Sequence, residues 1–264
     1  MKALAAPDGE VSDIATIPAM SGAVLSADSL APLDLWADHA RTQGWVCGYI
    51  QLALKNHRLR DLDPDRIVQH NIMIQFDLAT WHVDRSVRYK ARQAIKKGDK
   101  MGAVLVTEKA RLLAPFLDLY YPAMVRRGAT SVFPQACLEA WAVDPEVVLL
   151  GAEIDGRIEA VHLARMHGRH AEQHLAGLSE TGRALNLWLI WKATEYFRER
   201  GVHHFNIGGA GRPGDSIHWT KRRFNAQEFP LLSMRQVYDQ DRFDALCAAA
   251  GSGPATDRFP PYRV

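Results

Sequence analysis

The segment from Phe205 to Gln227, FNIGGAGRPGDSIHWTKRRFNAQ, gathers the residues of this chain best suited to catalysis. A short apolar strand leads into a loop with glycines at 208, 209, 211 and 214, and then into the consecutive cations Lys221, Arg222 and Arg223. Glycine allows a backbone to pass close to a ligand. A cation behind such a loop can stabilise an oxyanion, or hold a phosphate or carboxylate. We therefore predict an active site in this segment.

A cation placed in this way could serve acyl transfer to an amine, which is the reaction that a family resemblance of this chain implies. This reaction needs a neutral amine, a stabilised oxyanion and a hold on an activated donor, but no protein nucleophile. The sequence has no G-x-S-x-G elbow and no Walker A loop, and its three cysteines lack catalytic or zinc-binding spacing. The histidines also lack metal-ligand spacing, so we expect no metal site. The catalytic candidates are Asn206, His218, Lys221 and Arg222.

The general base is left open by the sequence. His218 lies in the segment from Phe205 to Gln227. His174 lies on a predicted strand near the long helix that precedes this segment. Either could take a proton, but a partly buried, hydrogen-bonded histidine is the commoner role for any single one.

Helices and an antiparallel meander must position this segment. An amphipathic helix is predicted over 83–97, and residues 146–178 are predicted to form three strands that turn at Asp155-Gly156 and near Gly168. A long, mostly apolar helix follows from 182 and ends at Gly201. The strand over 203–209 then enters the glycine-rich loop. This order predicts an α+β, or mixed α/β, fold.

Composition indicates an ordinary soluble globular protein of 264 residues, with 47% apolar and 23% charged residues. The 32 lysines and arginines nearly balance the 30 aspartates and glutamates, which leaves a net charge of +2 and no global case for nucleic-acid binding. Three widely spaced cysteines favour a reduced, cytoplasmic setting. No segment approaches the ~20 apolar residues of a membrane span.

Four segments together resemble the GNAT-fold acyltransferases of the Fem type. This group includes aminoacyl-tRNA-dependent enzymes that add amino acids to peptidoglycan precursors. The resemblance covers about residues 85–238 and is most specific over 182–224. It implies a GNAT-like fold with a central, largely antiparallel sheet flanked by helices. The segments are VRYKARQAIKKGDKMGAVLV, LLGAEIDGRIEAVHLARM, GLSETGRALNLWLIWKATEYFRERGVHHFNIGG and WTKRRFNAQ.

Domain boundaries follow from the same resemblance. Fem enzymes resemble two fused GNAT-like halves and are longer than this chain. We therefore predict a reduced N-terminal GNAT-like half with a flexible leader over 1–84, an acyltransferase domain over 85–250, and an irregular C-terminal tail over 251–264.

The resemblance places the donor site in SETGRA, residues 179–184. GNAT enzymes read Q/R-x-x-G-x-G/A here, because amides at a helix N-terminus bind the pyrophosphate of coenzyme A. Gly182 and Ala184 match this pattern, Ser179 replaces its first residue, and Arg183 could add a cation. A plain turn before a helix is the alternative for so short a pattern.

Two basic segments are candidates for binding the acceptor or its phosphate. The predicted helix over 83–97 carries Arg85, Arg88, Arg92 and Lys96 along one stripe, which could contact a nucleotide, a tRNA backbone or a phosphorylated acceptor. More often such a stripe is the solvated side of a helix. The K-R-x-F region of Fem-type enzymes is associated with their reacting centre, which implies a role for residues 221–224. The acceptor-binding candidates are Arg88, Arg92, Arg223 and Phe224.

We therefore predict an N-acyltransferase in which an amine attacks an activated carbonyl directly. The preferred co-substrate is acyl-CoA, because of the match in SETGRA and the weak overall charge. Aminoacyl-tRNA is the close alternative donor. The acceptor is predicted to be a small-molecule or precursor amine, with tRNA or an acyl carrier protein as a further partner. A non-catalytic module that binds an acyl carrier or a nucleotide is the remaining alternative.

Overall fold

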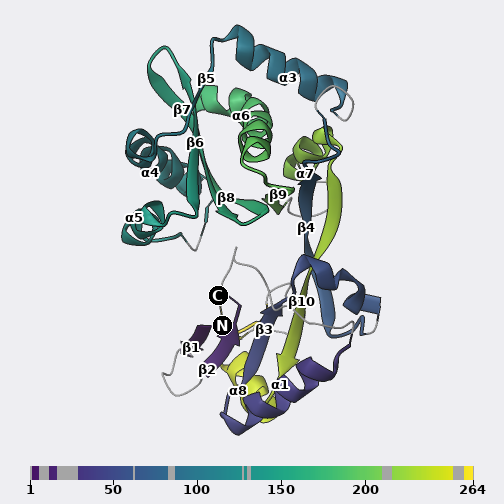
Figure 1. Ribbon diagram of the computed structural model, residues 1–264. Helices are drawn as coiled ribbons and strands as arrows, with labels where there is room; N and C mark the ends of the chain where they lie inside the picture. The colour runs from purple at the N-terminus through teal and green to yellow at the C-terminus, as the bar shows by residue number, and fades with distance from the viewer. Residues whose placement is uncertain are drawn as a thin grey trace. The chain divides into compact units, whose positions relative to one another are not determined.

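The structure is a computed structural model of the chain, and it divides into two compact units (Figure 1). Unit 1 comprises Met1–Ile72, Gly211–Pro213 and Phe229–Val264, and unit 2 comprises Met73–Ala210 and Gly214–Glu228. The residues that the structure describes are 2–5, 12–16, 29–61, 63–82, 87–126, 128–129, 132–209, 216–251 and 259–263. The domain boundaries predicted at 84 and 250 stay predictions.

Unit 1 is a small sheet covered on one face by a helix. Its strands follow the order β1, β2, β3, β10, β4, with β2 parallel to β3 and β3 antiparallel to β10. Leucine, isoleucine and methionine side chains of β3, β4 and β10 pack with Leu33 of α1 in its core. The elements are β1 (Lys2–Ala5), β2 (Ser12–Ala15), α1 (Ala31–Thr42), β3 (Cys47–Gln51), the 3-10 segment η1 (Leu54–Asp61), β4 (Ile67–Asp77), β10 (Gln227–Val237) and α8 (Gln240–Ala249). β4 and β10 also contribute residues to unit 2.

A segment near the start of the chain contacts one near its end within unit 1. The first two strands of the chain, β1 and β2, belong to this unit. Asp13 of β2 is buried, and its carboxylate accepts hydrogen bonds from Tyr262 (2.8 Å) and from the guanidinium of Arg263 (2.6 Å). The carboxylate of Asp13 therefore ties the last described residues to the second strand.

Unit 2 holds the predicted meander and the long helix. Its strands follow the order β4, β9, β8, β7, β6, β5, and all neighbours are antiparallel except β8 and β9. The elements are α3 (Tyr89–Lys100), β5 (Val104–Val106), α4 (Lys109–Arg126), α5 (Gln135–Val143), β6 (Val147–Ile154), β7 (Arg157–His167), β8 (His170–Leu178), α6 (Glu180–Glu199), β9 (His204–Gly209), α7 (Ser216–Lys221) and the 3-10 turn η2 (Arg222–Phe224). The predicted mixed α/β class with a largely antiparallel sheet is confirmed.

Local sequence rules explain the centre of unit 2. Asp155 (φ 47°) and Gly156 (φ 78°) both adopt the left-handed conformation that a two-residue type I′ hairpin requires. α6 begins after Ser179 and stops at Gly201, which has φ 75°. α4 and α5 cover one face of the sheet and α6 covers the other (Figure 1). The predicted hairpin, meander and long helix are therefore confirmed.

The helix predicted over 83–97 begins and ends later than expected. Residues 83–86 lie outside the described part of the chain, and α3 starts at Tyr89 because Arg88 is extended (ψ 151°). The helix continues through Gly98, which packs against Trp188 of α6. A Cβ at this position would come within 2.5 Å of the Trp188 ring. Gly98 therefore permits close helix packing and does not end the helix.

Across the described residues, the structure contains no helix that combines the length and the apolar character needed to cross a bilayer.

Candidate active site

The parallel strands β8 and β9 separate at the centre of unit 2. They pair only over His170–Glu172 and His204–Asn206, although β8 continues to Leu178 and β9 to Gly209. Gly208 (φ 76°) lies where the ladder ends, and a Cβ there would come within 2.9 Å of the Gln173 carbonyl. Both its conformation and this contact require glycine. Beyond this point, the backbone polar groups of β8 and β9 no longer pair with each other.

Lys221 is anchored at the end of β9. Its ammonium group donates hydrogen bonds to the carbonyl oxygens of Ile207 (2.5 Å) and Gly209 (2.8 Å). α7 delivers this side chain from the far side of the glycine-rich loop, whose residues 210–215 lie outside the described part of the chain. A fixed positive charge therefore stands where β8 and β9 separate.

Asn206 stabilises the same strand end. Its side chain is buried, and its Oδ1 accepts a hydrogen bond from the backbone N–H of Gly208 (2.8 Å). In the ladder it lies opposite Glu172 of β8. The predicted candidates Asn206 and Lys221 therefore come together around the last residues of β9.

His218 and Arg222 share one carboxylate. His218 Nε2 lies 3.0 Å from Glu228, and the Arg222 guanidinium lies 2.7 Å from the other oxygen of that carboxylate. Burial raises the pKa of Glu228, but the hydrogen bond from His218 and the charge of Arg222 outweigh this effect and lower it. Glu228 is therefore ionised, and it fixes the orientation of the buried His218 ring.

Glu172 of β8, opposite Asn206 in the ladder, is a further candidate that was not predicted from the sequence. The preceding pair, Ala171 and Phe205, faces α6, because the Phe205 ring packs on Phe197 at 4.8 Å. Strand alternation turns Glu172 to the opposite face. Burial raises the pKa of its carboxyl group to about 7. A carboxyl group with this pKa can take up and release a proton near neutral pH.

A signal for Glu172 was present in the sequence. The strand HAEQHLAGL is predicted to lie between two other strands, in the interior of the sheet. Ionisable side chains are rarely buried in such a position. A glutamate in an interior strand of a sheet therefore marks a candidate functional group, although its pKa depends on packing.

Two histidines, His162 of β7 and His174 of β8, are uncharged at neutral pH. Burial, with a smaller contribution from the charge of Lys221, lowers the pKa of His162 to about 4, although a hydrogen bond to Asn186 opposes this shift. Burial also lowers the pKa of His174 to about 4. His174 was one of the two predicted bases, and with this pKa it is a weak base at pH 7. No group of three or more metal-ligating side chains occurs among the described residues.

The predicted donor residues lie at the start of α6, but the helix caps itself. Ser179 Oγ accepts a hydrogen bond from the Gly182 amide (2.9 Å), and the Ser179 hydroxyl donates to the Glu159 carboxylate. Gly182 is pressed against β7, where a Cβ would come within 1.9 Å of the Glu159 carbonyl oxygen. Arg183 is exposed and Ala184 is half-buried. Gly182 therefore has a structural role in helix capping and packing.

The two basic segments meet in unit 2. The backbone N–H of Arg88, just before α3, donates to the carbonyl oxygen of Arg223 in η2 (2.9 Å). We define the α3–η2 basic surface as Arg88, Arg92, Lys96 and Arg223, of which Arg88 and Lys96 are exposed and the others half-buried. Arg85 lies outside the described residues. Two cationic segments that are distant in sequence therefore adjoin in the fold.

Phe224 packs in the core of unit 2. Its ring is fully buried beside Phe76 (5.6 Å), and its carbonyl oxygen accepts a hydrogen bond from the Trp81 indole (2.9 Å). The predicted contact of Phe224 with an acceptor is therefore corrected to a packing role, because its side chain is not accessible.

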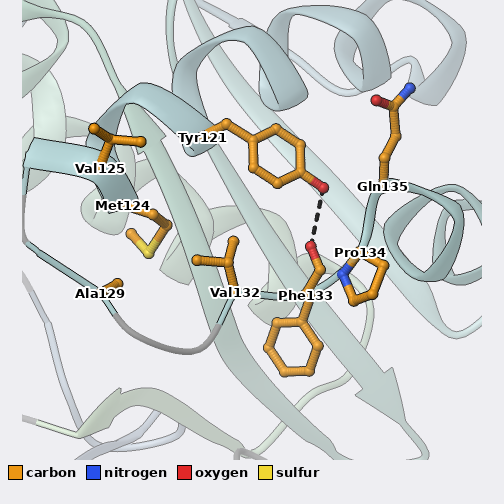
Figure 2. A pocket seen from close by; sticks show the side chains of 8 residues that line it. All are labelled: Tyr121, Met124, Val125, Ala129, Val132, Phe133, Pro134 and Gln135. Carbon is orange, nitrogen blue, oxygen red and sulfur yellow. Dashed lines mark hydrogen bonds between the residues drawn. The ribbon is translucent and has the colours of Figure 1, made fainter.

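An apolar pocket of about 490 Å³ lies between the end of α4 and the start of α5 (Figure 2). Tyr121 donates a hydrogen bond to the carbonyl oxygen of Phe133 across it (3.0 Å). The lining residues carry no charged side chain, and none of the predicted site residues is among them. They are Tyr121, Met124, Val125, Ala129, Val132, Phe133, Pro134 and Gln135. The pocket lining is therefore mostly apolar, with the Tyr121 hydroxyl and the Gln135 amide as its polar side-chain groups.

Solved structures identify the class of fold. FemX superimposes with a TM-score of 0.65 at 12% identity, over 89% of this chain and 82% of that one. L-PGS from Bacillus licheniformis superimposes with a TM-score of 0.60 at 13% identity, over 76% of this chain and 71% of that one. The resemblance to the Fem type is thus confirmed at the level of the fold.

A family model then gives the family. Residues 85–218 match the model described as an acetyltransferase (GNAT) domain, which covers just over half of the 264 residues. The chain belongs to the GNAT acetyltransferase family and is an acyltransferase. Comparison with curated protein sequences gives no match.

Proposed function

We propose that this acyltransferase takes an aminoacyl group from aminoacyl-tRNA and transfers it to an amine of a small-molecule or precursor acceptor. The start of α6 carries the proposal. In the GNAT enzymes that this chain resembles, the pyrophosphate of coenzyme A binds to free amides at the corresponding helix N-terminus. Here the Ser179 hydroxyl already occupies the Gly182 amide, and the Glu159 carboxylate lies directly behind it. A pyrophosphate would have to displace the cap beside a negative charge, which disfavours it.

The α3–η2 basic surface supports the same donor. A nucleic-acid backbone is bound chiefly through its phosphates by lysine and arginine. The net charge of +2 provides no general attraction, so that binding has to be local. The junction of Arg88 with Arg223 joins cations from two elements into one surface.

The residues at the end of the β8–β9 ladder supply the chemistry. Glu172 takes a proton from the acceptor ammonium, and the resulting amine attacks the ester carbonyl of the donor. A C–N bond forms, the C–O bond to the tRNA breaks, and the leaving oxygen receives a proton from the attacking nitrogen. Lys221 supplies positive charge at the strand end while the oxyanion exists. Glu172 then returns its proton to water.

Acyl-CoA is the second candidate donor. The observation in its favour is the position of Gly182 and Ala184 in the first turn of a long helix, with the exposed Arg183 between them. Arg183 has no part in the cap, so it provides a clean test. If coenzyme A binds here, Arg183→Gln weakens its affinity without changing the fold.

Binding of tRNA and of coenzyme A by the intact protein tests the proposal. We expect tRNA to bind with a steep salt dependence. Replacing Arg88, Arg92 and Lys96 together by glutamine should reduce the salt slope by roughly one for each phosphate group that these cations neutralise. The matched control replaces three exposed arginines on other elements, Arg157, Arg169 and Arg200, and should leave the slope nearly unchanged.

Transfer of a labelled aminoacyl group from tRNA to an amine then separates catalysis from binding. Transfer that falls in the α3 triple variant and persists in the control variant supports the proposal. Binding of coenzyme A that depends on Arg183, together with no specific tRNA binding, would establish acyl-CoA as the donor. Binding without any transfer would favour a non-catalytic module.

A further inference from the structure

The position of the Lys221 ammonium depends on how α7 is held. The ammonium binds the carbonyl oxygens of Ile207 and Gly209 on β9, whereas the backbone of Lys221 ends α7. A lysine side chain is a flexible four-carbon stem, so these two hydrogen bonds alone do not fix the backbone from which it extends. A shift of α7 would therefore move the charge away from the end of β9.

α7 cannot keep this position by its own helix stability. It has six residues, and isolated helices shorter than about 12 residues are marginal in water. Ile217 and Trp219 are 45% and 53% exposed, so they contribute little packing. The buried residue of α7 is His218, which is 5% exposed. Contacts of His218 and of the following turn must therefore fix the helix.

The C-terminal side of α7 is fixed through η2. The Phe224 ring is fully buried, and the Trp81 indole donates a hydrogen bond to the Phe224 carbonyl oxygen. The Arg88 backbone N–H donates to the carbonyl oxygen of Arg223. These contacts hold the residues that follow Lys221. The turn of helix that precedes Lys221 needs a separate anchor.

Glu228, at the start of β10, binds a residue on each side of Lys221. One of its carboxylate oxygens lies 3.0 Å from His218 Nε2, and the other lies 2.7 Å from Arg222 Nε. His218 and Arg222 are four residues apart, a spacing that brings side chains to one face of a helical turn. One carboxylate therefore spans the turn that carries Lys221.

We propose that Glu228 is a positioning residue of this acyltransferase. By binding His218 and Arg222 together, it keeps α7 where the Lys221 ammonium reaches the end of β9. Its effect on catalysis follows from the role of Lys221 at the oxyanion, and so rests on the proposed function. A misplacement of about 1 Å in an active site can cost about 10²-fold in rate. Glu228 thus controls turnover without touching either substrate.

Acylation of lysines by acetic anhydride reports on the Lys221 ammonium without any turnover. An amine must lose its proton to react, and an ammonium that donates to two carbonyl oxygens therefore reacts slowly. We expect Glu228→Ala to raise the labelling rate of Lys221 by about threefold or more, relative to the exposed Lys100 of α3 in the same molecule. Mass spectrometry of peptides quantifies both lysines. A wild-type labelling rate of Lys221 in Glu228→Ala would overturn the proposal.

Glu146 provides a matched control in unit 2. Its carboxylate also binds an arginine and a histidine, Arg165 (2.6 Å) and His167 of β7. Its side chain is 30% exposed, against 32% for Glu228. Glu146→Ala should leave the labelling rate of Lys221 within about twofold of the wild type, because it removes the same kind of contact from other elements. An equal rise in both variants would indicate general loosening and would also overturn the proposal.

A double-mutant cycle in steady-state kinetics connects this position to catalysis. Glu228→Ala should lower kcat by about tenfold or more and change the KM values little, whereas Glu228→Gln, which keeps one acceptor oxygen, should retain more activity. In a Lys221→Met background, Glu228→Ala should cost less than about threefold, because its effect passes through the absent ammonium. Full additivity of the two losses would contradict an action through Lys221.

The two readouts separate the positioning role from the proposed function. Faster labelling of Lys221 with unchanged turnover would support the positioning role and refute the catalytic role of Lys221. If the wild type transfers no aminoacyl group, the labelling comparison still decides whether Glu228 positions the ammonium. If Glu228→Ala does not fold, Glu228→Gln takes its place, with Glu146→Gln as the control.

Discussion

Replacing Glu172 by glutamine should make the protein more stable and much less active. Folding raises the pKa of this carboxyl group from 4.5 to about 7, because burial disfavours its charge. The folded state therefore holds the proton more tightly than the unfolded chain. The stability linked to this proton is fully present below pH 4.5 and is lost as the pH rises through 7. Glutamine keeps the shape of the side chain but never ionises.

The linkage relation gives the size of the effect. The free energy of unfolding of Glu172→Gln should exceed that of the wild type by about 1 kcal/mol at pH 5 and by about 3 kcal/mol at pH 8. Any difference between the two proteins that does not depend on pH adds equally to both values. His170 lies on the same face of the sheet and is present in both proteins, so its effect cancels in the comparison. Urea unfolding at pH 5, 6, 7 and 8 measures the difference.

The same variant tests the catalytic role. If Glu172 accepts the proton of the acceptor, kcat/KM should fall by about 10²- to 10⁴-fold, and the rise of activity near pH 7 should disappear from the pH profile. A stability difference that does not change with pH would refute the reasoning about the pKa. Unchanged activity with an altered stability profile would show that Glu172 is buried without a role in catalysis.

Three further substitutions test the site and the fold. Lys221→Met removes the ammonium that binds the carbonyl oxygens of Ile207 and Gly209, and should cut turnover by about 10²-fold or more in steady-state assays, with partial recovery in Lys221→Arg. Gly182→Ala places a Cβ against the backbone of β7, and should lower the free energy of unfolding by about 2 kcal/mol or more in urea, whereas an unchanged value would contradict the close contact. Arg263→Gln leaves the buried Asp13 carboxylate without its guanidinium, and should cost about 3 kcal/mol in thermal or urea unfolding. A wild-type midpoint would argue against that anchor.

The sequence predicted most securely the elements that depend on neighbouring residues. Asp155-Gly156 indicated a tight hairpin because few residue pairs tolerate positive φ at both positions. Gly201 was predicted as the end of the long helix from its backbone preference, and α6 does stop there, whereas the helix starts at Glu180 and not at the predicted Gly182. The resemblance to the GNAT fold rested on the order of these elements, and the family match confirms it.

The predicted site needed tertiary information at several positions. Gly182 fits a donor-binding pattern in the sequence, but its contact with Glu159 of β7 becomes visible only when the helix packs on the sheet. Phe224 lies in a basic motif, yet burial beside Phe76 turns it inward. Lys221 remains a catalytic candidate, and the structure adds the two strand-end carbonyl oxygens that fix it.

By itself, the sequence determined the order of elements, the turns and the family of this protein, because each depends on local conformational preferences and on the periodicity of apolar residues. Only the tertiary structure decided which polar groups share a site and how they titrate. The junction of Arg88 with Arg223 and the pKa of Glu172 both depend on residues that are distant in the chain and on the exclusion of water. Burial changes the free energy of a charged group through its whole surroundings, and a linear sequence does not specify those surroundings.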